Sequence, residues 1–332
     1  GMSVNVIYLK GNPDLDFKFE LAGVNVVGDF ASKNPVFQLL QIRKYLTSKT
    51  AILHCHLPRA ELIGSIAKKK NLLILSKHNS EPFFPGAPEF VSRFLSRFVS
   101  KRASACIAIS NAVRDYIVDN DEITKSLQID VIPYGFDEDF KLDPDVRHKL
   151  LMQLPQGSPI VGAVGRLAPQ KDYPTLLHAF SVFLLHSPTA QLIILGSGPD
   201  EEKLHKLTQD LEITQNVKFV GNSNQVSEWM SLFDFFVLPS RYEGFGLVLL
   251  EAMQSETPII AAKNSAIPEI LGEDYFGLFQ TSDVASLSQQ LYNFSFIAKR
   301  KESKRLLEQR LELFRPDIMG ARVNSIYLKV AS

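Results

Sequence analysis

Two carboxylates and two glycines lie close together in the stretch Pro239–Met253. Glu243 and Glu251 are separated by seven residues, and Gly244 and Gly246 lie between them. The apolar run before this stretch predicts a buried strand, and the Pro-free apolar segment after Gly246 predicts a helix. Glycine lets the backbone approach a ligand closely, and the free N–H groups at a helix start favour an anion. The pattern therefore predicts a strand-to-helix turn that binds an anionic ligand, with Glu243 toward its reacting end.

The same spacing also has an ordinary structural interpretation. A Glu-Gly pair often precedes a helix simply as part of a turn, and a glutamate such as Glu251 in the first turns can complement the helix dipole without any function. Spacing alone leaves both interpretations open.

Two further loops follow predicted strands of the same half. The loop Gly165–Asp172 carries Arg166, whose planar fork suits phosphate oxygens, and Lys171, a flexible point charge. Basic residues in such loops are usually only solvated, but a position after the first strand of an α/β domain favours contact with an anion. Gly196 and Gly198 follow the next strand; a lone Gly-x-Gly is a weak signal that a simple turn also explains.

Histidines mark two predicted strand ends in the first half of the chain. His78 follows the strand Leu72–Leu75 in a polar turn, so we expect it to project beyond the strand, although a surface or core histidine is the ordinary alternative. His54 and His56 end an earlier strand. His-x-His spacing suits a metal, but no third ligand lies nearby, and the acidic run 137–139 is typical of a solvated turn. No metal site is predicted.

The whole string beginning Pro239-Ser-Arg-Tyr-Glu-Gly-Phe-Gly resembles the signature of the family 4 (group 1) retaining glycosyltransferases, with their Glu-x7-Glu motif. The resemblance covers nearly the whole chain and is strongest over residues 160–271. It implies an α/β protein of the GT-B fold, with two doubly wound, Rossmann-like domains facing a central cleft. It also implies a retaining hexosyltransferase that moves a sugar from a UDP- or GDP-linked donor to an acceptor hydroxyl, in the synthesis of cell-surface polysaccharide or lipopolysaccharide.

The resemblance carries roles over to individual residues. In the family, the Arg and Lys of this loop hold the donor diphosphate. The family's histidine that corresponds to His78 contacts the donor sugar near the anomeric carbon. The first motif Glu faces the transferred sugar and the second accepts hydrogen bonds from the ribose hydroxyls. The catalytic residues implied are Glu243, His78, Arg166 and Lys171, and the donor-binding residues are Gly165, Arg166, Lys171, Gly196, Gly198, Val220, Gly244, Phe245, Gly246, Leu247 and Glu251.

Two departures from the family pattern bear on activity. The family usually begins with a strand and a Gly-Gly loop that touches donor phosphate and acceptor, and we expect this chain to lack them. Ser265 and Ala266 stand where a second Gly-Gly is usual. The alternative function is therefore a nucleotide-sugar-binding protein of the same fold without transferase activity. An epimerase on this fold is a third possibility, which the Glu-x7-Glu string disfavours.

Length and composition predict a globular protein of two domains. The chain has 332 residues, of which 45% are hydrophobic and 22% charged. No apolar run is long enough to cross a membrane, no signal peptide is evident, and Cys55 and Cys106 lie in apolar runs, which fits a reducing cytoplasm. We expect a truncated acceptor-side Rossmann-like domain over 1–138, a linker over 139–158, a donor-binding domain over 159–315, and a C-terminal helix over 316–332 that crosses back to the first domain.

Charge is distributed unevenly along the chain. Residues 1–114 hold 16 Lys or Arg and 7 Asp or Glu, a balance of +9, and the remainder balances at −9. A basic half favours an anionic partner, either a membrane surface or a charged acceptor, over nucleic acid, for which no binding module is present. The predicted helix 89–102 carries an apolar stripe flanked by arginines; a core-facing helix is favoured, and an interfacial helix on anionic lipid is the alternative.

The resulting expectations for partners are a nucleotide-sugar donor, a glycan or lipid-linked acceptor, and peripheral contact with an anionic membrane. We expect the protein in the cytoplasm or at the inner face of the membrane, with no cofactor and no metal.

Overall fold

The computed structural model describes residues 3–10, 16–27, 30, 34–47, 50–136, 141–154 and 157–332. The chain forms two compact units. The first comprises Gly1–Ile109, Arg114–Val131 and Val323–Ser332, and the second comprises Ser110–Val113 and Ile132–Arg322.

The first unit is built on a four-stranded parallel sheet with the order β3-β4-β5-β6. Its core strands are almost wholly apolar because a parallel sheet is buried on both faces. Leu73, Leu75 and Cys106 lie in that core and are fully buried. The strands are β3 (Ile52–His56), β4 (Leu72–Lys77), β5 (Ala105–Ala108) and β6 (Ile129–Val131). The helices are α2 (Pro35–Tyr45), α3 (Pro58–Ala67), α4 (Glu89–Ser100) and α5 (Asn111–Asp119); α1 (Asp16–Leu21) and the short pair β1 (Asn5–Val6) and β2 (Asn25–Val26) precede them.

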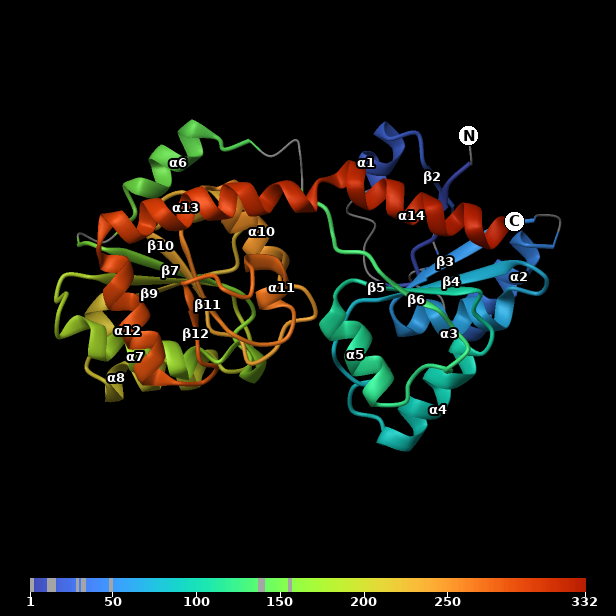
Figure 1. The fold of residues 1–332 in the computed structure, drawn as a ribbon, viewed down its shortest axis with the longest axis horizontal. Helices are drawn as coiled ribbons and strands as arrows, with labels where there is room; N and C mark the ends of the chain where they lie inside the picture. Colours follow the sequence, from blue (N-terminus) through green and yellow to red (C-terminus); the bar gives the residue numbers. More distant parts are fainter. Residues whose placement is uncertain are drawn as a thin grey trace. The chain divides into compact units, whose positions relative to one another are not determined.

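The second unit is built on a six-stranded parallel sheet with the order β12-β11-β10-β7-β8-β9. The strands are β7 (Ile160–Val164), β8 (Gln191–Leu195), β9 (Val217–Gly221), β10 (Phe235–Leu238), β11 (Ile259–Ala262) and β12 (Leu278–Phe279). Figure 1 shows α7 (Tyr173–Leu184), α8 (Glu201–Asp210) and α12 (Val284–Ser295) together against one face of this sheet. The strand order reverses between β7 and β10, and in open α/β sheets ligands bind at the carboxyl ends of the strands at such a switch point.

The remaining helices of the second unit complete its surface. They are α6 (Pro144–Leu151), α9 (Val226–Met230), α10 (Leu247–Gln254), α11 (Ile267–Leu271), α13 (Ile297–Leu311) and α14 (Pro316–Ala331), the last of which ends in the first unit. Among the residues described, no helix is both long and apolar enough to cross a membrane.

The predicted strands of the second half match β7 to β11 closely, but the predicted linker 139–158 contains the helix α6. Asp143 and Pro144 are typical of a turn between elements, but here the Asp143 carboxylate accepts hydrogen bonds from the N–H groups of Asp145 and Val146. Asp143 is thus an N-cap and Pro144 occupies the first helical position, where its missing N–H costs nothing. The predicted boundary at residue 138 and the acidic run 137–139 lie outside the described residues.

The predicted core-facing stripe of α4 is buried only in part. We expected the stripe that begins with Phe90 to face the core, but Phe90 is 74% exposed and Phe94 is 69% exposed. Leu95 and Phe98 of the stripe pack against the core, and the buried residues of α4 are Val99 together with Ser92, Ser96 and Ser100.

Candidate functional site

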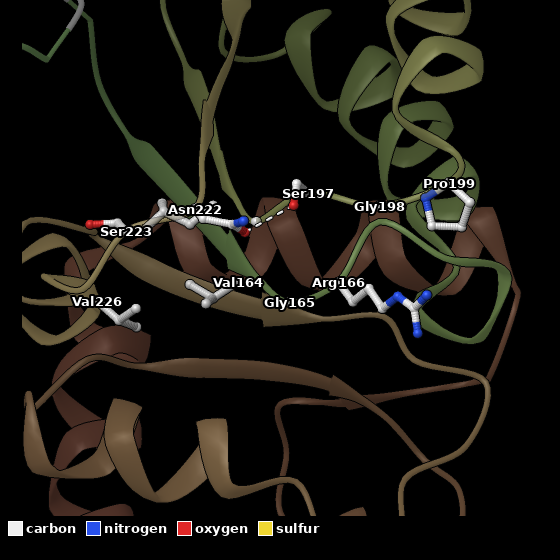
Figure 2. Close-up of a pocket in the computed structure, with 11 residues that line it drawn as sticks. Val164, Gly165, Arg166, Ser197, Gly198, Pro199, Asn222, Ser223 and Val226 are labelled. Atoms are coloured by element: carbon white, nitrogen blue, oxygen red, sulfur yellow. Dashed lines mark hydrogen bonds between the residues drawn. The ribbon is translucent and has the colours of Figure 1, made fainter. Parts of the chain in front are cut away.

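The loops that follow β7, β8 and β9 enclose a pocket of about 790 Å³ in the second unit. Figure 2 shows Arg166 at one end of this pocket and Ser223 and Val226 at the other. The lining residues are Val164, Gly165, Arg166, Leu195, Gly196, Ser197, Gly198, Pro199, Asn222, Ser223 and Val226. The pocket therefore lies at the carboxyl edge of the sheet and includes four of the residues predicted to bind the donor.

Three glycines allow the first two of these loops to approach each other. A Cβ on Gly196 would lie 2.0 Å from the carbonyl oxygen of Gly165, and a Cβ on Gly198 would lie 2.3 Å from the carbonyl oxygen of Leu167. Gly165 and Gly196 also have φ values of 153° and 128°. The weak Gly-x-Gly signal thus marks a close approach of two backbones, which any side chain would prevent.

Backbone hydrogen bonds hold these loops in register. The Gly165 N–H donates to Leu195 O over 3.0 Å, the Leu167 N–H donates to Ser197 O over 2.9 Å, and the Gly196 N–H donates to Gly221 O over 2.8 Å. The pocket wall is therefore a set of paired backbones, which is a rigid frame for a ligand.

The sequence did not single out Ser197 and Asn222, whose side chains meet at the pocket. The Ser197 hydroxyl donates to the Asn222 side-chain oxygen over 3.0 Å, as the dashed line in Figure 2 shows. Val220, which was predicted to bind the donor, lies in β9 and is not among the lining residues that the structure describes. Ser197 and Asn222 each lie just after the end of a strand, and this position is the signal that could have identified them.

Lys171 and Glu243 contact each other directly. The Lys171 Nζ lies 2.5 Å from Glu243 Oε1, and the Ser240 hydroxyl donates to the same oxygen over 2.7 Å. The side chains are only 17% and 8% exposed. Burying an unpaired carboxylate costs free energy, and the Lys171 ammonium and the Ser240 hydroxyl offset that cost for Glu243.

Further contacts fasten the Lys171 loop to the Glu243 loop. The Gln170 side chain donates to Tyr242 O over 2.9 Å, and the Arg241 N–H donates to Gln170 O over 2.8 Å. Asp172, in the left-handed region at φ 48°, accepts hydrogen bonds from Arg241, Thr175 and Ser282 over 3.1, 3.0 and 2.6 Å. Sequence reasoning missed this network because its members come from three separate segments.

The other motif residues occupy distinct environments. Gly246 precedes α10 with φ 92°, and Leu247 is 48% exposed. Phe245 is buried against Tyr134 and Phe314, at ring separations of 5.2 and 6.0 Å, so only its backbone can meet a ligand. Burial raises the pKa of Glu251, which lies in α10. Gly244 lies in the loop before α10, where its flexibility was predicted to matter.

In the first unit, the predicted histidine His78 belongs to a cluster. Its Nε2 lies 2.9 Å from Nδ1 of His56. His54 lies between two hydroxyls, with Nδ1 2.7 Å from the Tyr327 oxygen and Nε2 2.7 Å from the Ser76 oxygen. Burial, reinforced by the neighbouring histidines, lowers the pKa of His54 to about 3, and burial with His56 and Lys77 nearby lowers the pKa of His78 to about 4. Both rings are therefore neutral at physiological pH.

These two pKa shifts predict a stability change with pH. Both folded pKa values lie below the unfolded value of 6.5, so between pH 6.5 and about 4 the unfolded chain binds more protons. Stability contributed by neutral His54 and His78 is present above pH 6.5 and is lost as pH falls. At about 1.36 kcal/mol per pKa unit, we expect each of the two histidines to contribute a loss on the order of 3 kcal/mol over this pH range. Urea unfolding at several pH values measures it.

The control for this experiment is the double variant His54→Gln, His78→Gln. Gln keeps hydrogen-bonding capacity without titrating, so the difference in slope between wild type and variant isolates the histidines from other titrating groups. An identical slope in both proteins would contradict the assignment.

No set of three or more His, Cys, Asp or Glu side chains within the described residues is placed to hold a metal ion. Metal independence stays a prediction.

Two family models together match most of this chain. The model described as "Glycosyltransferase Family 4" matches residues 1–140, and the model described as "Glycosyl transferases group 1" matches residues 152–306. The chain belongs to the group 1 glycosyltransferases, which confirms the family predicted from the motif string.

Individual proteins support the same family. The chain is 28% identical over 232 residues to the GDP-mannose-dependent alpha-(1-6)-phosphatidylinositol monomannoside mannosyltransferase of Mycobacterium tuberculosis, covering 67% of this chain and 58% of that one. It is 28% identical over 196 residues to the lipopolysaccharide core biosynthesis mannosyltransferase LpsB of Rhizobium meliloti, covering 57% of this chain and 54% of that one. The matched region thus spans somewhat more than half the length of these curated relatives.

A solved structure shows the fold. HepE from Anabaena, in complex with UDP and glucose, superimposes with a TM-score of 0.82 over 98% of this chain and 91% of its own, at 19% identity. The fold is the GT-B type with two Rossmann-like domains, as the sequence predicted.

Proposed function

We propose that this protein is a retaining glycosyltransferase that moves a sugar from a UDP- or GDP-linked donor to an acceptor hydroxyl. The observation that supports this most is the pocket at the switch point of the second unit. It combines a glycine-lined wall with Arg166, in the unit that also holds the Lys171–Glu243 pair. HepE, which shares the fold, was solved with UDP and glucose.

The chemistry proposed for this site is stabilisation of a leaving diphosphate. As the bond between the anomeric carbon and the diphosphate oxygen breaks, negative charge grows on the oxygens, where Arg166, Lys171 and the start of α10 after Gly246 can stabilise it. A diphosphate would share the Lys171 ammonium with Glu243, which lies 2.5 Å from it. The acceptor oxygen forms its new bond on the face that the diphosphate leaves and passes its proton to a diphosphate oxygen, so the anomeric configuration is retained.

We assign the other predicted residues their roles as proposals. Glu243 faces the transferred sugar, Glu251 accepts hydrogen bonds from the ribose, and His78 contacts the donor sugar near the anomeric carbon. No cofactor or metal takes part in this scheme.

We propose a glycan or lipid-linked acceptor, in cell-surface polysaccharide or lipopolysaccharide synthesis, at the inner face of the cytoplasmic membrane. The names of two relatives point to lipid-linked acceptors and lipopolysaccharide. The balance of +9 over residues 1–114 favours an anionic membrane over nucleic acid, and the free, buried cysteines Cys55 and Cys106 fit a reducing compartment.

Arg166→Ala tests the proposal. Loss of a charge-assisted hydrogen bond costs about 1.5–3 kcal/mol, so we expect kcat/KM for donor hydrolysis to fall roughly 10- to 150-fold. A panel of UDP- and GDP-sugars, assayed for binding and hydrolysis with and without EDTA, identifies the donor and tests metal independence.

The matched control is Arg147→Ala. Arg147 lies in the same unit and hydrogen-bonds Ser231, and neither residue is among the described residues that line the pocket. Unchanged hydrolysis in Arg166→Ala would contradict the diphosphate assignment. Binding of a nucleotide sugar without any turnover would favour the alternative, a binding protein of the same fold.

A further inference from the structure

Helix α4 turns its serines toward the core of the first unit. Ser92, Ser96 and Ser100 recur every fourth residue, so they lie on one face of the helix, and they are 1%, 0% and 2% exposed. Each side chain is hydrogen-bonded. Ser92 Oγ accepts from the Phe84 N–H over 2.7 Å, Ser100 Oγ accepts from the Thr124 N–H over 3.1 Å, and Ser96 Oγ donates to Glu122 over 3.4 Å. These bonds satisfy the hydroxyl groups that α4 buries.

The opposite face of α4 presents aromatic rings to solvent. Phe90 and Phe94 are 74% and 69% exposed, the most exposed phenylalanines among the residues described. They are four residues apart, and Arg97 and Lys101 follow at helical spacing on the same side. Leu95 and Phe98, by contrast, pack against the core cluster. The two exposed rings therefore contribute little to the core of the first unit.

Basic side chains surround these rings. Arg93 pairs with Glu89 at 2.5 Å, and Arg97 pairs with Asp121, but both arginines remain more than a third exposed. Exposed pairs of this kind are weak and screened by salt, so both guanidinium groups can turn to an anionic surface. An aromatic face bordered by Arg and Lys is typical of a helix that lies in a membrane interface.

We propose that the α4 face formed by Phe90, Phe94, Arg97 and Lys101 docks on an anionic phospholipid bilayer. The two rings enter the boundary between headgroups and acyl chains, and the cations contact lipid phosphates. This inference deepens the membrane contact in the proposed function and rests on it. Two rings on one helix are few for a stable protein interface, which buries about 800 Å² on each partner, but they suffice for shallow insertion.

Vesicle co-sedimentation tests the docking surface, with phosphatidylcholine vesicles that contain or lack phosphatidylglycerol. We expect wild type to bind the anionic vesicles and to dissociate as salt rises. The variant Phe90→Ser, Phe94→Ser should lower the vesicle partition coefficient on the order of tenfold. The variant Arg97→Gln, Lys101→Gln should lower it comparably, and only for anionic vesicles. Both pairs are on the surface, so both variants should fold.

The matched control is Phe296→Ser, which removes a ring that is 51% exposed in the second unit and should leave vesicle binding unchanged. Each protein is also assayed for nucleotide-sugar binding in the absence of vesicles, which α4 substitutions should not alter. Wild type that binds a nucleotide sugar but no anionic vesicle would overturn the docking surface and leave the proposed activity standing. Vesicle binding without nucleotide-sugar binding would do the reverse. Self-association that the α4 phenylalanine variant abolishes, without vesicle binding, would indicate a protein partner instead.

Discussion

Lys171→Ala is expected to destabilise the folded protein by about 3 kcal/mol and to abolish measurable donor hydrolysis. The substitution leaves Glu243, whose side chain is 8% exposed, without the cation that lies 2.5 Å from it. A buried carboxylate that loses its partner keeps the full cost of desolvation, and among the described residues the Ser240 hydroxyl is the hydrogen-bond donor that remains to offset it. Urea unfolding and the hydrolysis assay measure the two effects separately.

A double variant separates the stabilising role of this pair from its proposed catalytic role. Lys171→Met with Glu243→Gln removes both charges, and replacing a buried pair by less polar side chains is often nearly neutral. We expect stability to return to within about 1 kcal/mol of wild type while hydrolysis stays lost. Recovery of hydrolysis in the double variant would show that neither residue handles the donor.

An exposed ion pair provides the comparison for Lys171→Ala. Lys299 pairs with Glu302 at 2.9 Å, with both side chains nearly half exposed, and Lys299→Ala should cost less than about 1 kcal/mol. Similar losses from Lys171→Ala and Lys299→Ala would contradict the account of Lys171 as the partner of a buried carboxylate.

Gly196→Ala is expected to cost at least about 3 kcal/mol and to eliminate nucleotide binding, because backbone strain and overpacking act together at this position. The new Cβ would lie 2.0 Å from the Gly165 carbonyl oxygen, and φ at Gly196 is +128°, a conformation that alanine strongly disfavours. The contact is with backbone, so no side chain can move aside. The two loops must separate, and the pocket wall that they form is then lost.

Gly221→Ala is the control, because it imposes positive φ without a clash. Gly221 has φ +77° and nothing within 4 Å of its would-be Cβ. We expect only the backbone cost of about 1–2 kcal/mol, with nucleotide affinity largely retained. Unfolding free energies and UDP affinities of both variants measure the contrast. Equal effects at both positions would show that the close approach of the loops is not what requires Gly196.

Much of the second unit could be predicted because its signals are local. Each apolar run such as Phe235–Leu238 is buried on both faces of a parallel sheet, so composition alone predicts the strand. Glycine positions after those strands also carry information, since only glycine fits where two backbones meet. The helix α6 was missed for an equally local reason: Asp143 and Pro144 favour a turn and a helix start alike, and the following helix is short.

The exposure of Phe90 and Phe94 was not predicted, because an apolar stripe does not show which of its residues reach the core when a neighbouring polar face can also be buried with its hydrogen bonds made. Ser96 donates a hydrogen bond to Glu122, and Ser100 accepts one from the Thr124 N–H; both partners follow β5 in the chain. Such partners are known only once the chain has folded, and they make burial of the serine face favourable.

The sequence by itself determined the family, the alternation of strands and helices, and the residue types that the proposed donor site needs. The tertiary structure alone decided which of them meet. Lys171 and Glu243 are 72 residues apart and touch because β7 and β10 are neighbours in the sheet. His54 and Tyr327 are 273 residues apart and form one hydrogen bond. Strand order and long-range packing depend on how the whole chain buries its apolar surface, so they cannot be predicted from a local sequence pattern.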